Sequence, residues 1–144
     1  MKIGILKEQD EKRVALVPET VKKLIEEGNE VVVEKEAGQL SLLSDTLYKE
    51  AGAQVVNRKE VLSSANLVCN IHPLAVKELS MMSPGTVYVT SFQPFVSLDK
   101  TEEANKAQLT VMSLDMIPRI TIAQSMDILS SMASIAGYKG VIQA

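Results

Sequence analysis

Residues 30–34 have the sequence E-V-V-V-E, a run of β-branched side chains that predicts a strand and decides the fold. Before this strand, Pro18 begins a predicted helix that ends at Gly28. After it, a second predicted helix begins near Asp45 and ends at Gly52. This stretch is therefore predicted to form a strand with one helix before it and one helix after it.

The same alternation continues toward both ends of the chain. Further strands are predicted at residues 2–6, 54–56, 67–71, 86–91 and 109–113. Further helices are predicted at residues 59–63, 76–81 and 99–107. Short strands that alternate with helices are typical of a parallel sheet covered by helices. The prediction is an α/β fold of three layers, with a mostly parallel sheet and helices on both faces, in one domain over residues 1–144.

The composition argues against several classes of function. Apolar residues make up 46% and charged residues 23% of the chain, as in ordinary globular proteins. The net charge of −3 and the absence of a basic cluster argue against nucleic acid as a partner. No apolar run is long enough for direct membrane insertion. The single cysteine and the lack of a signal-peptide pattern predict a cytoplasmic location.

Sites in parallel sheets form where the strands end, so the residues after each strand are the candidates. They are Lys7, Glu8 and Arg13 after the first strand, Asn70 and His72 after the fourth, Phe92 and Gln93 after the fifth, and residues 114–124 after the last. Residues of these types bind anions and amides, and they do not form the acid–base pair of a general acid–base catalyst. Arg13 either forms a surface ion pair or holds a carboxylate or phosphate.

Several familiar sites are missing from the sequence. No G-x-G-x-x-G fingerprint and no Walker-type phosphate loop occur, so a complete dinucleotide-binding unit is not expected. One cysteine, Cys69, and one histidine, His72, do not make a zinc site, and no metal is predicted. Cys69 lies within an apolar strand, where a small buried hydrophobe is expected.

The stretch at residues 116–138, M-I-P-R-I-T-I-A-Q-S-M-D-I-L-S-S-M-A-S-I-A-G-Y, is the richest in polar side chains. Ser125 is predicted to cap a helix whose first turn contains Asp127. Gly137 is predicted to end or bend this helix. Its apolar residues recur at helical spacing, which predicts an amphipathic stripe. The stripe consists of Met126, Leu129, Met132, Ala133 and Ala136.

Four polar residues of this stretch, Arg119, Gln124, Asp127 and Ser130, lie on the loop and the first turns of the helix. They could converge on one polar ligand. An equally simple interpretation is a capped surface helix that follows a Pro-Arg turn, because capping residues are common. Spacing alone leaves both interpretations open.

Several motifs resemble the N-terminal domain of the alanine dehydrogenase and proton-translocating NAD(P) transhydrogenase family. They are K-I-G-I-L-K-E at residues 2–8, K-R-V-A-L-V-P-E-T-V-K-K-L at 12–24, E-V-V-V-E-K-E-A-G at 30–38 and Y-K-E-A-G-A-Q-V-V at 48–56. The most specific motif, P-R-I-T-I-A-Q-S-M-D-I-L-S-S-M-A-S-I-A-G-Y at 118–138, resembles the transhydrogenase alpha subunit more than alanine dehydrogenase. The resemblance covers the whole chain and implies a flavodoxin-like N-terminal domain.

The resemblance implies a function in hydride transfer between NADH and NADP, coupled to proton translocation by membrane-spanning partner components. NAD would be bound mainly by a second, Rossmann domain, which this chain lacks, and NADP by a partner component. By position, Arg119, Gln124, Asp127 and Ser130 match family residues that reach the nicotinamide end of NAD(H). Gln124 and Asp127 would lie at the site of hydride transfer. The family also implies a homodimer, peripheral to the inner membrane through its partners.

Two departures from the family pattern bear on function. The family chain would continue past Ala144 into the Rossmann domain, so this chain would be either one excised domain or one whose partner domain is encoded separately. The family usually has a lysine at the end of the fourth strand, which holds the keto acid in alanine dehydrogenase; here Asn70 or Cys69 takes its place. Arg13 matches the arginine that binds the substrate carboxylate in alanine dehydrogenase, and a structural pairing is the alternative.

Three functions therefore remain open from the sequence. The first is a transhydrogenase domain that is active only with its Rossmann domain and membrane partners. The second is a non-catalytic binding or scaffold module of the same fold. The third is the N-terminal domain of an alanine dehydrogenase, which the loss of the lysine disfavours.

Overall fold

In a computed structural model, which describes residues 1–143, six parallel strands form one sheet. The strands are β1 (Lys2–Ile5), β2 (Glu30–Glu34), β3 (Gln54–Val56), β4 (Leu67–Cys69), β5 (Val87–Thr90) and β6 (Thr110–Ser113). Their spatial order is β3-β2-β1-β4-β5-β6. This is the doubly wound order of dinucleotide-binding sheets, and it differs from the 2-1-3-4-5 order of flavodoxin itself. The predicted α/β class with a parallel sheet is confirmed.

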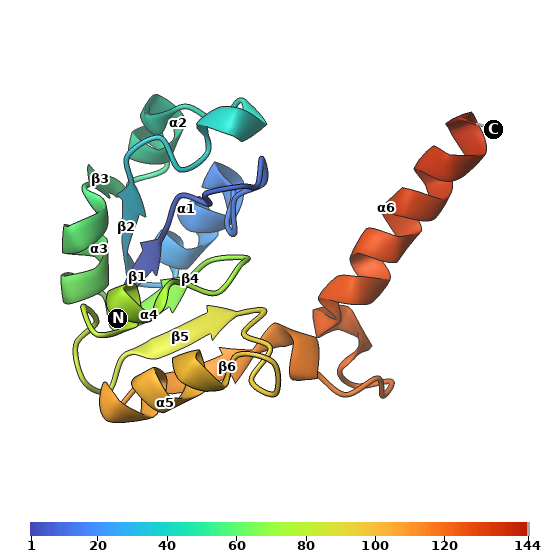
Figure 1. The fold of residues 1–144 in the computed structure, drawn as a ribbon. Helices are drawn as coiled ribbons and strands as arrows, with labels where there is room; N and C mark the ends of the chain where they lie inside the picture. Colours follow the sequence, from blue (N-terminus) through green and yellow to red (C-terminus); the bar gives the residue numbers. More distant parts are fainter. Residues whose placement is uncertain (144) are drawn as a thin grey trace.

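Helices cover both faces of the sheet (Figure 1). They are α1 (Pro18–Glu26), α2 (Asp45–Glu50), α3 (Arg58–Ser64), α4 (Val76–Leu79), α5 (Leu98–Lys106) and α6 (Ile128–Gln143), with single 3-10 turns η1 (Gln39–Ser41), η2 (Leu114–Met116) and η3 (Gln124–Met126). On one face, Val21 of α1 and Tyr48 of α2 pack with alternate residues of β1 and β2. On the other face, Val61 of α3 and Leu79 of α4 pack with Val68 and Tyr88 of the sheet.

The two faces follow from the alternation of side chains along each strand. In β2, Val31 and Val33 belong to the core under α1 and α2, whereas Val32 belongs to the core under α3, α4 and α5. All three valines are almost completely buried. A strand that is apolar on both faces, such as E-V-V-V-E, is therefore explained by helices on both sides.

Glycines end the helices where the sequence predicts. Gly28 after α1 and Gly52 after α2 have φ angles of 86° and 96°, a left-handed conformation that glycine adopts without a steric penalty. Pro18 occupies the first turn of α1, as predicted. At α3 the cap is Asn57, whose side chain accepts a hydrogen bond from the N–H of Glu60 at 2.9 Å.

The structure differs from the predicted details of α6 in three places. Ser125 belongs to η3 and does not cap α6; Asp127 lies just before the helix and caps it instead. Gly137 does not end the helix, which continues to Gln143. No residue of α6 is buried, so within residues 1–143 the apolar stripe is not covered by a core. In Figure 1 α6 projects away from the sheet, and Ala144 lies outside the described residues.

None of the helices within residues 1–143 combines the length and the hydropathy that crossing a bilayer requires.

Gly4 provides a test of how closely α3 packs on β1. A Cβ atom at Gly4 would lie 2.7 Å from Cγ1 of Val61 and 2.9 Å from Cβ of Ala65, both on or next to α3. We expect Gly4→Ala to lower the free energy of unfolding by about 1–3 kcal/mol, because the helix must move to admit the methyl group. Urea unfolding followed by tyrosine fluorescence measures this change.

Gly140→Ala is the matched control for this substitution. A Cβ atom at Gly140 has no neighbour within 4 Å, and alanine favours a helix. The urea midpoint of this variant should be unchanged or slightly raised. Equal losses of stability at Gly4 and Gly140 would contradict the close packing of α3 on β1.

Candidate functional site

The carboxyl ends of β1 and β4 form the topological switch point of the sheet. From β1 the chain continues to β2 on one side, and β4 lies on the other side of β1. The loops that leave β1 and β4 therefore diverge and leave a crevice between them, which is where ligands bind in open α/β sheets. A cavity of about 400 Å³ lies there, lined by residues of the β1 and β4 loops and by α3 and α4. Its lining residues are Lys7, Glu8, Gln9, Asp10, Arg58, Asn70, His72, Pro73, Leu74, Ala75 and Glu78.

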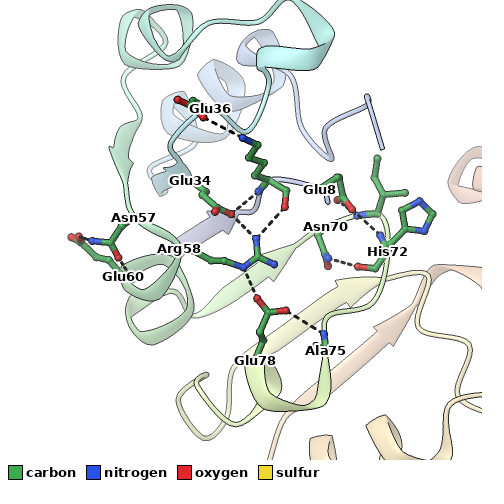
Figure 2. Close-up of polar contacts among 12 residues, drawn as sticks. Glu8, Glu34, Glu36, Asn57, Arg58, Glu60, Asn70, His72, Ala75 and Glu78 are labelled. Carbon is green, nitrogen blue, oxygen red and sulfur yellow. Dashed lines mark hydrogen bonds and ion pairs between the residues drawn. The ribbon is translucent and has the colours of Figure 1, made fainter. Parts of the chain in front are cut away.

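Glu8 joins the two loops. Its carboxylate accepts hydrogen bonds from the backbone N–H groups of Ile71 and His72, the second at 3.2 Å (Figure 2). Glu8 is only 5% exposed, so these bonds also satisfy a buried charge. β4 ends at Cys69, two residues before the predicted end. Beyond it, the N–H of Asn70 still donates to the Val89 carbonyl at 3.2 Å, whereas the N–H groups of Ile71 and His72 donate to Glu8.

Arg58, the first residue of α3, joins the ends of β1 and β2 to α4. Its Nε donates to Glu78 Oε1 at 2.5 Å, and its Nη1 donates to Glu34 Oε2 at 2.8 Å and to the carbonyl of Lys7 at 3.1 Å (Figure 2). Burial opposes the charge on Arg58, but the hydrogen bonds and charges of Glu78 and Glu34 outweigh it and raise the pKa of the guanidinium. Glu34 also accepts from the N–H of Lys7 at 2.8 Å.

The roles of Arg58, Glu34 and Glu78 were not predicted from the sequence. The two carboxylates lie 24 and 20 residues from Arg58 along the chain. Their side chains and that of Arg58 are 14–24% exposed, so the network is partly shielded from water. Removal of one partner from such a network leaves a poorly hydrated charge behind, which is strongly destabilising.

Asn70, one of the two residues expected in place of the family lysine, lies on the wall of the cavity and is 5% exposed. Its Nδ2 donates to the carbonyl of His72. Its Oδ1 is buried and has no hydrogen-bond partner among the described residues. His72 itself is exposed, and its Nε2 lies 3.6 Å from Glu11 Oε2.

Asp127 and Ser130 are the two members of the predicted quartet that the structure brings into contact. Asp127 Oδ2 accepts from the Ser130 hydroxyl at 2.6 Å, and Oδ1 accepts from the N–H of Leu129 at 3.0 Å. The Ser130 hydroxyl is the main cause of a lowered pKa at Asp127, and the charge of Arg119 adds to it. Because the pKa is lowered in the folded state, this cap stabilises α6 above the ordinary carboxyl range and is lost as the pH falls through the folded-state pKa.

The other two members of the quartet are placed more loosely. Arg119 lies in the loop between η2 and η3 and acts on Asp127 by its charge. Gln124 lies in η3, where its backbone carbonyl accepts from the N–H of Asp127 at 3.2 Å. Within residues 1–143 the Gln124 side chain makes no hydrogen bond, and it is exposed. Convergence of all four on one ligand therefore stays a prediction.

Arg13 forms a structural pairing, the alternative that the sequence left open. Its Nη2 donates to Glu11 Oε2 at 2.6 Å. Its Nη1 lies 3.1 Å from Sδ of Met132, which joins the β1 loop to α6. Binding of a substrate carboxylate by Arg13 stays a prediction, since one face of the guanidinium is already used by Glu11.

Neither a reactive thiol nor a metal-binding cluster is apparent among residues 1–143. Partial burial raises the pKa of the Cys69 thiol to about 11, so the thiol is protonated at neutral pH. Cys69 is half-buried, whereas full burial was predicted. Among residues 1–143, no three side chains of the His, Cys, Asp and Glu types gather as a metal would need.

The sequence model of the family described as "Alanine dehydrogenase/PNT, N-terminal domain" matches residues 4–136. The chain belongs to this family. The match includes most of the quartet-bearing stretch as well as the loops of the switch point.

Relatives in this family point to transhydrogenases. The chain is 34% identical over 151 residues to an NAD(P) transhydrogenase alpha-subunit protein of Rickettsia prowazekii, and 37% identical over 150 residues to one of Rhodospirillum rubrum. These alignments cover 100% and 99% of this chain but only 39% of each relative. The chain therefore spans about two fifths of the length of these relatives.

Solved structures of the family confirm the fold. A transhydrogenase from Sinorhizobium meliloti matches with a TM-score of 0.92 and 38% identity, covering 100% of this chain and 44% of that one. An L-alanine dehydrogenase matches with a TM-score of 0.75 and 30% identity, covering 81% of this chain and 33% of that one. The likeness to the transhydrogenase thus extends over α6, which the sequence motif at residues 118–138 anticipates.

Arg13 lowers the pKa of Glu11 from 4.5 to about 2, chiefly through their side-chain hydrogen bond. In the folded chain, this pairing contributes stability above about pH 4.5 that is lost as the pH falls toward 2. We expect Arg13→Gln to return the pKa of Glu11 toward 4.5, as measured by NMR titration of the carboxyl carbon.

Lys12→Gln is the control for this titration, because it removes a charge from the same loop. Only the backbone N–H of Lys12 contacts Glu11, so the pKa of Glu11 should stay low in this variant. If the pKa were equally low in Arg13→Gln, the pairing would not be its cause.

Proposed function

We propose that this chain is the domain of an NAD(P) transhydrogenase alpha subunit that closes over the nicotinamide end of NAD(H). In this proposal a second, Rossmann domain binds most of NAD(H), and a partner component binds NADP. Membrane-spanning components couple hydride transfer to proton translocation, and the alpha subunit is a cytoplasmic homodimer held at the inner membrane by those partners. The observation that carries the proposal is the match of the whole chain, including residues 118–138, to transhydrogenase alpha subunits.

The residues at the start of α6 suit a nicotinamide group. The exposed amide of Gln124 has a free donor and a free acceptor, as a carboxamide requires. Asp127 is ionised and held in place by Ser130 and by the N–H of Leu129. Its negative charge, beside the positive charge of Arg119, can favour one orientation of a ring whose charge changes with oxidation.

The roles follow from positioning. Arg119 and Asp127 would orient the ring and its carboxamide, Ser130 would fix the Asp127 carboxylate, and Gln124 would lie beside the reacting carbon. NAD(H) itself supplies the hydride. Transfer of a hydride between two nicotinamides releases no proton at the reacting carbons. An acid–base pair is therefore not needed, and none is apparent around Asp127 within the described residues.

Asn70 disfavours alanine dehydrogenase as the alternative. It is a buried neutral amide, and it or Cys69 stands where the family resemblance implies a lysine that holds a keto acid. A neutral amide does not supply the positive charge that would offset the carboxylate of that substrate.

Asp127→Asn and Arg119→Ala in the complete transhydrogenase test the site. Asparagine caps a helix about as well as aspartate, so Asp127→Asn removes the charge and leaves α6 capped. We expect each variant to lower the hydride-transfer rate by about tenfold or more, as lost electrostatic positioning does, with little change in the unfolding temperature. Stopped-flow absorbance with NADH and an NADP analogue measures the rate.

Lys139→Ala is the control, since it removes a charge from an exposed position later in α6. It should leave the rate unchanged. If Asp127→Asn and Arg119→Ala both transferred hydride at the rate of the unaltered enzyme, the assignment of the site would be wrong.

A titration of NAD(H) tests the division between two domains. The chain of 144 residues should bind NADH weakly, because the contacts to pyrophosphate and adenosine would lie on the Rossmann domain. Calorimetry with and without that domain, supplied as the rest of the alpha subunit, should show tight binding only when it is present. Equally tight binding by the chain alone would contradict this division.

A further inference from the structure

On one face of the sheet, the cover of helices extends over only half of the strands. Residues paired in the register of neighbouring parallel strands have their side chains on the same face. One such row crosses the sheet from β2 to β6 and consists of Val33, Ile5, Cys69, Val89 and Met112. Val33 and Ile5 are fully buried. Cys69 and Val89 are only half-buried, and Met112 is 57% exposed, so the cover stops after β1.

The neighbouring row loses its cover in the same way. Leu67 of β4 and Val87 of β5 are half-buried, and Thr110 of β6 is exposed. On the opposite face, Tyr88 of β5 is fully buried, and Val111 of β6 packs on the core. Only one face of these three strands is therefore open. We call it the open half-face, and its side chains are Leu67, Cys69, Val87, Val89, Thr110 and Met112.

The open half-face follows from the winding of the chain. The order β3-β2-β1-β4-β5-β6 means that the chain runs outward in one direction from β1 to β3 and in the other direction from β4 to β6. Right-handed crossovers then place α1 and α2 on one face and the later helices on the other. The cores agree, since α1 and α2 pack with β1 and β2, whereas α3, α4 and α5 share the other core (Figure 1).

The side chains of the open half-face call for an apolar cover. None of them is charged, and Thr110 is the only polar side chain apart from the thiol of Cys69. Cys69, Val87, Val89 and Met112 belong to neither core within residues 1–143. Parallel sheets are normally buried by helices on both faces. The three strands form a face about 10 Å wide between the outer strand axes and about 13 Å long, which one helix of two to three turns covers.

α6 does not provide this cover. It has no buried residue, and it contacts the body of the domain through Met132, whose Sδ lies 3.1 Å from Arg13 Nη1. The match to the transhydrogenase of Sinorhizobium meliloti, with a TM-score of 0.92, includes all of this chain and 44% of that one. α6 therefore keeps its place in a chain more than twice as long, and the open half-face is left for another segment.

We propose that an amphipathic helix from the remainder of the alpha subunit packs on the open half-face, with a side that is apolar and uncharged. The alignments leave about three fifths of each transhydrogenase relative outside this chain, which is ample for such a helix. A segment of the same subunit reaches the face intramolecularly, and its high effective concentration favours it over a second copy of the chain.

This proposal rests on the function proposed above in one point only, which is that the partner is the rest of an alpha subunit. It does not involve the residues proposed to reach NAD(H), and its test needs no nucleotide. If Asp127→Asn leaves hydride transfer unchanged while the open half-face is covered, only the proposed nucleotide site fails. If hydride transfer responds as expected while the face stays open, only the present proposal fails.

Thiol labelling of Met112→Cys and Asn105→Cys compares the two faces. Met112 lies on the open half-face, and Asn105 is exposed on α5 over the other face. N-ethylmaleimide should modify both thiols rapidly in the 144-residue chain, as measured by mass spectrometry of the labelled peptides. In the complete alpha subunit the rate at position 112 should fall by about tenfold or more, because a packed helix must open before the thiol reacts, and the rate at position 105 should not change.

Thr110→Cys gives a second position on the same face in case Met112→Cys does not fold. It should be protected in the complete subunit to a similar degree. Equally fast labelling of the open half-face in the chain alone and in the complete subunit would overturn the proposal.

Met112→Lys and Asn105→Lys test the apolar character of the contact, since both add one positive charge. In the chain alone both should leave the midpoint of thermal unfolding unchanged, because both positions are exposed. In the complete subunit Met112→Lys should lower the midpoint by about 4 °C or more, as an unpaired charge under a helix does, and Asn105→Lys should not. Equal midpoints of the two variants in the complete subunit would contradict an apolar contact at the open half-face.

A second copy of the chain is the competing occupant, and concentration distinguishes it. The labelling rate at position 112 in the chain alone should be the same at low and high micromolar concentration. If the rate fell as the concentration rose, with a doubled mass in sedimentation, the open half-face would belong to a second copy and the proposal would be overturned.

Discussion

The guanidinium of Arg58 is the interaction on which the carboxyl edge of the sheet depends. It bonds to the end of β2 through Glu34, to the chain after β1 through the Lys7 carbonyl, and to α4 through Glu78. These elements leave the sheet in different directions, because β1 is the strand at which the winding reverses. One planar group with a fixed fork of donors can hold them at a set separation, which a lysine cannot do. A charge network therefore bridges the elements that border the crevice.

A third carboxylate, that of Glu8, completes this arrangement on the opposite side of the crevice. Glu8 lies on the β1 loop and accepts from two successive N–H groups after β4, so the two loops are joined by hydrogen bonds. Further along the same loop, Arg13 contacts Glu11 and Met132, which links the loop to the start of the C-terminal helix. The switch point and the segment that bears Asp127 are thus joined through one loop, although they lie far apart in the sequence.

The sequence was sufficient for the layers but not for the polar contacts. The alternation of apolar strands with helices, and the glycines that end the helices, are local features of the sequence. For this reason β2 and β3 were predicted with their observed ends. The cap of α6 was misplaced because Ser125 and Asp127 are both good caps, and only the backbone decides between them. The partners of Arg58 and the unused oxygen of Asn70 depend on which loops meet across the sheet, and no local pattern encodes that. Of the quartet, the contact of Asp127 with Ser130 follows from their spacing of three residues, whereas the placement of Arg119 does not.

The C-terminal helix has sixteen residues, none of them buried. Helices of that length are marginal in water unless a tertiary contact supports them. In this chain taken alone, its amide protons should therefore exchange with solvent far faster than those of the sheet, and its ellipticity should fade gradually on heating while the sheet melts in one step. The sheet and its helices would thus unfold cooperatively, whereas the C-terminal helix would unfold gradually and separately, until another surface covers it.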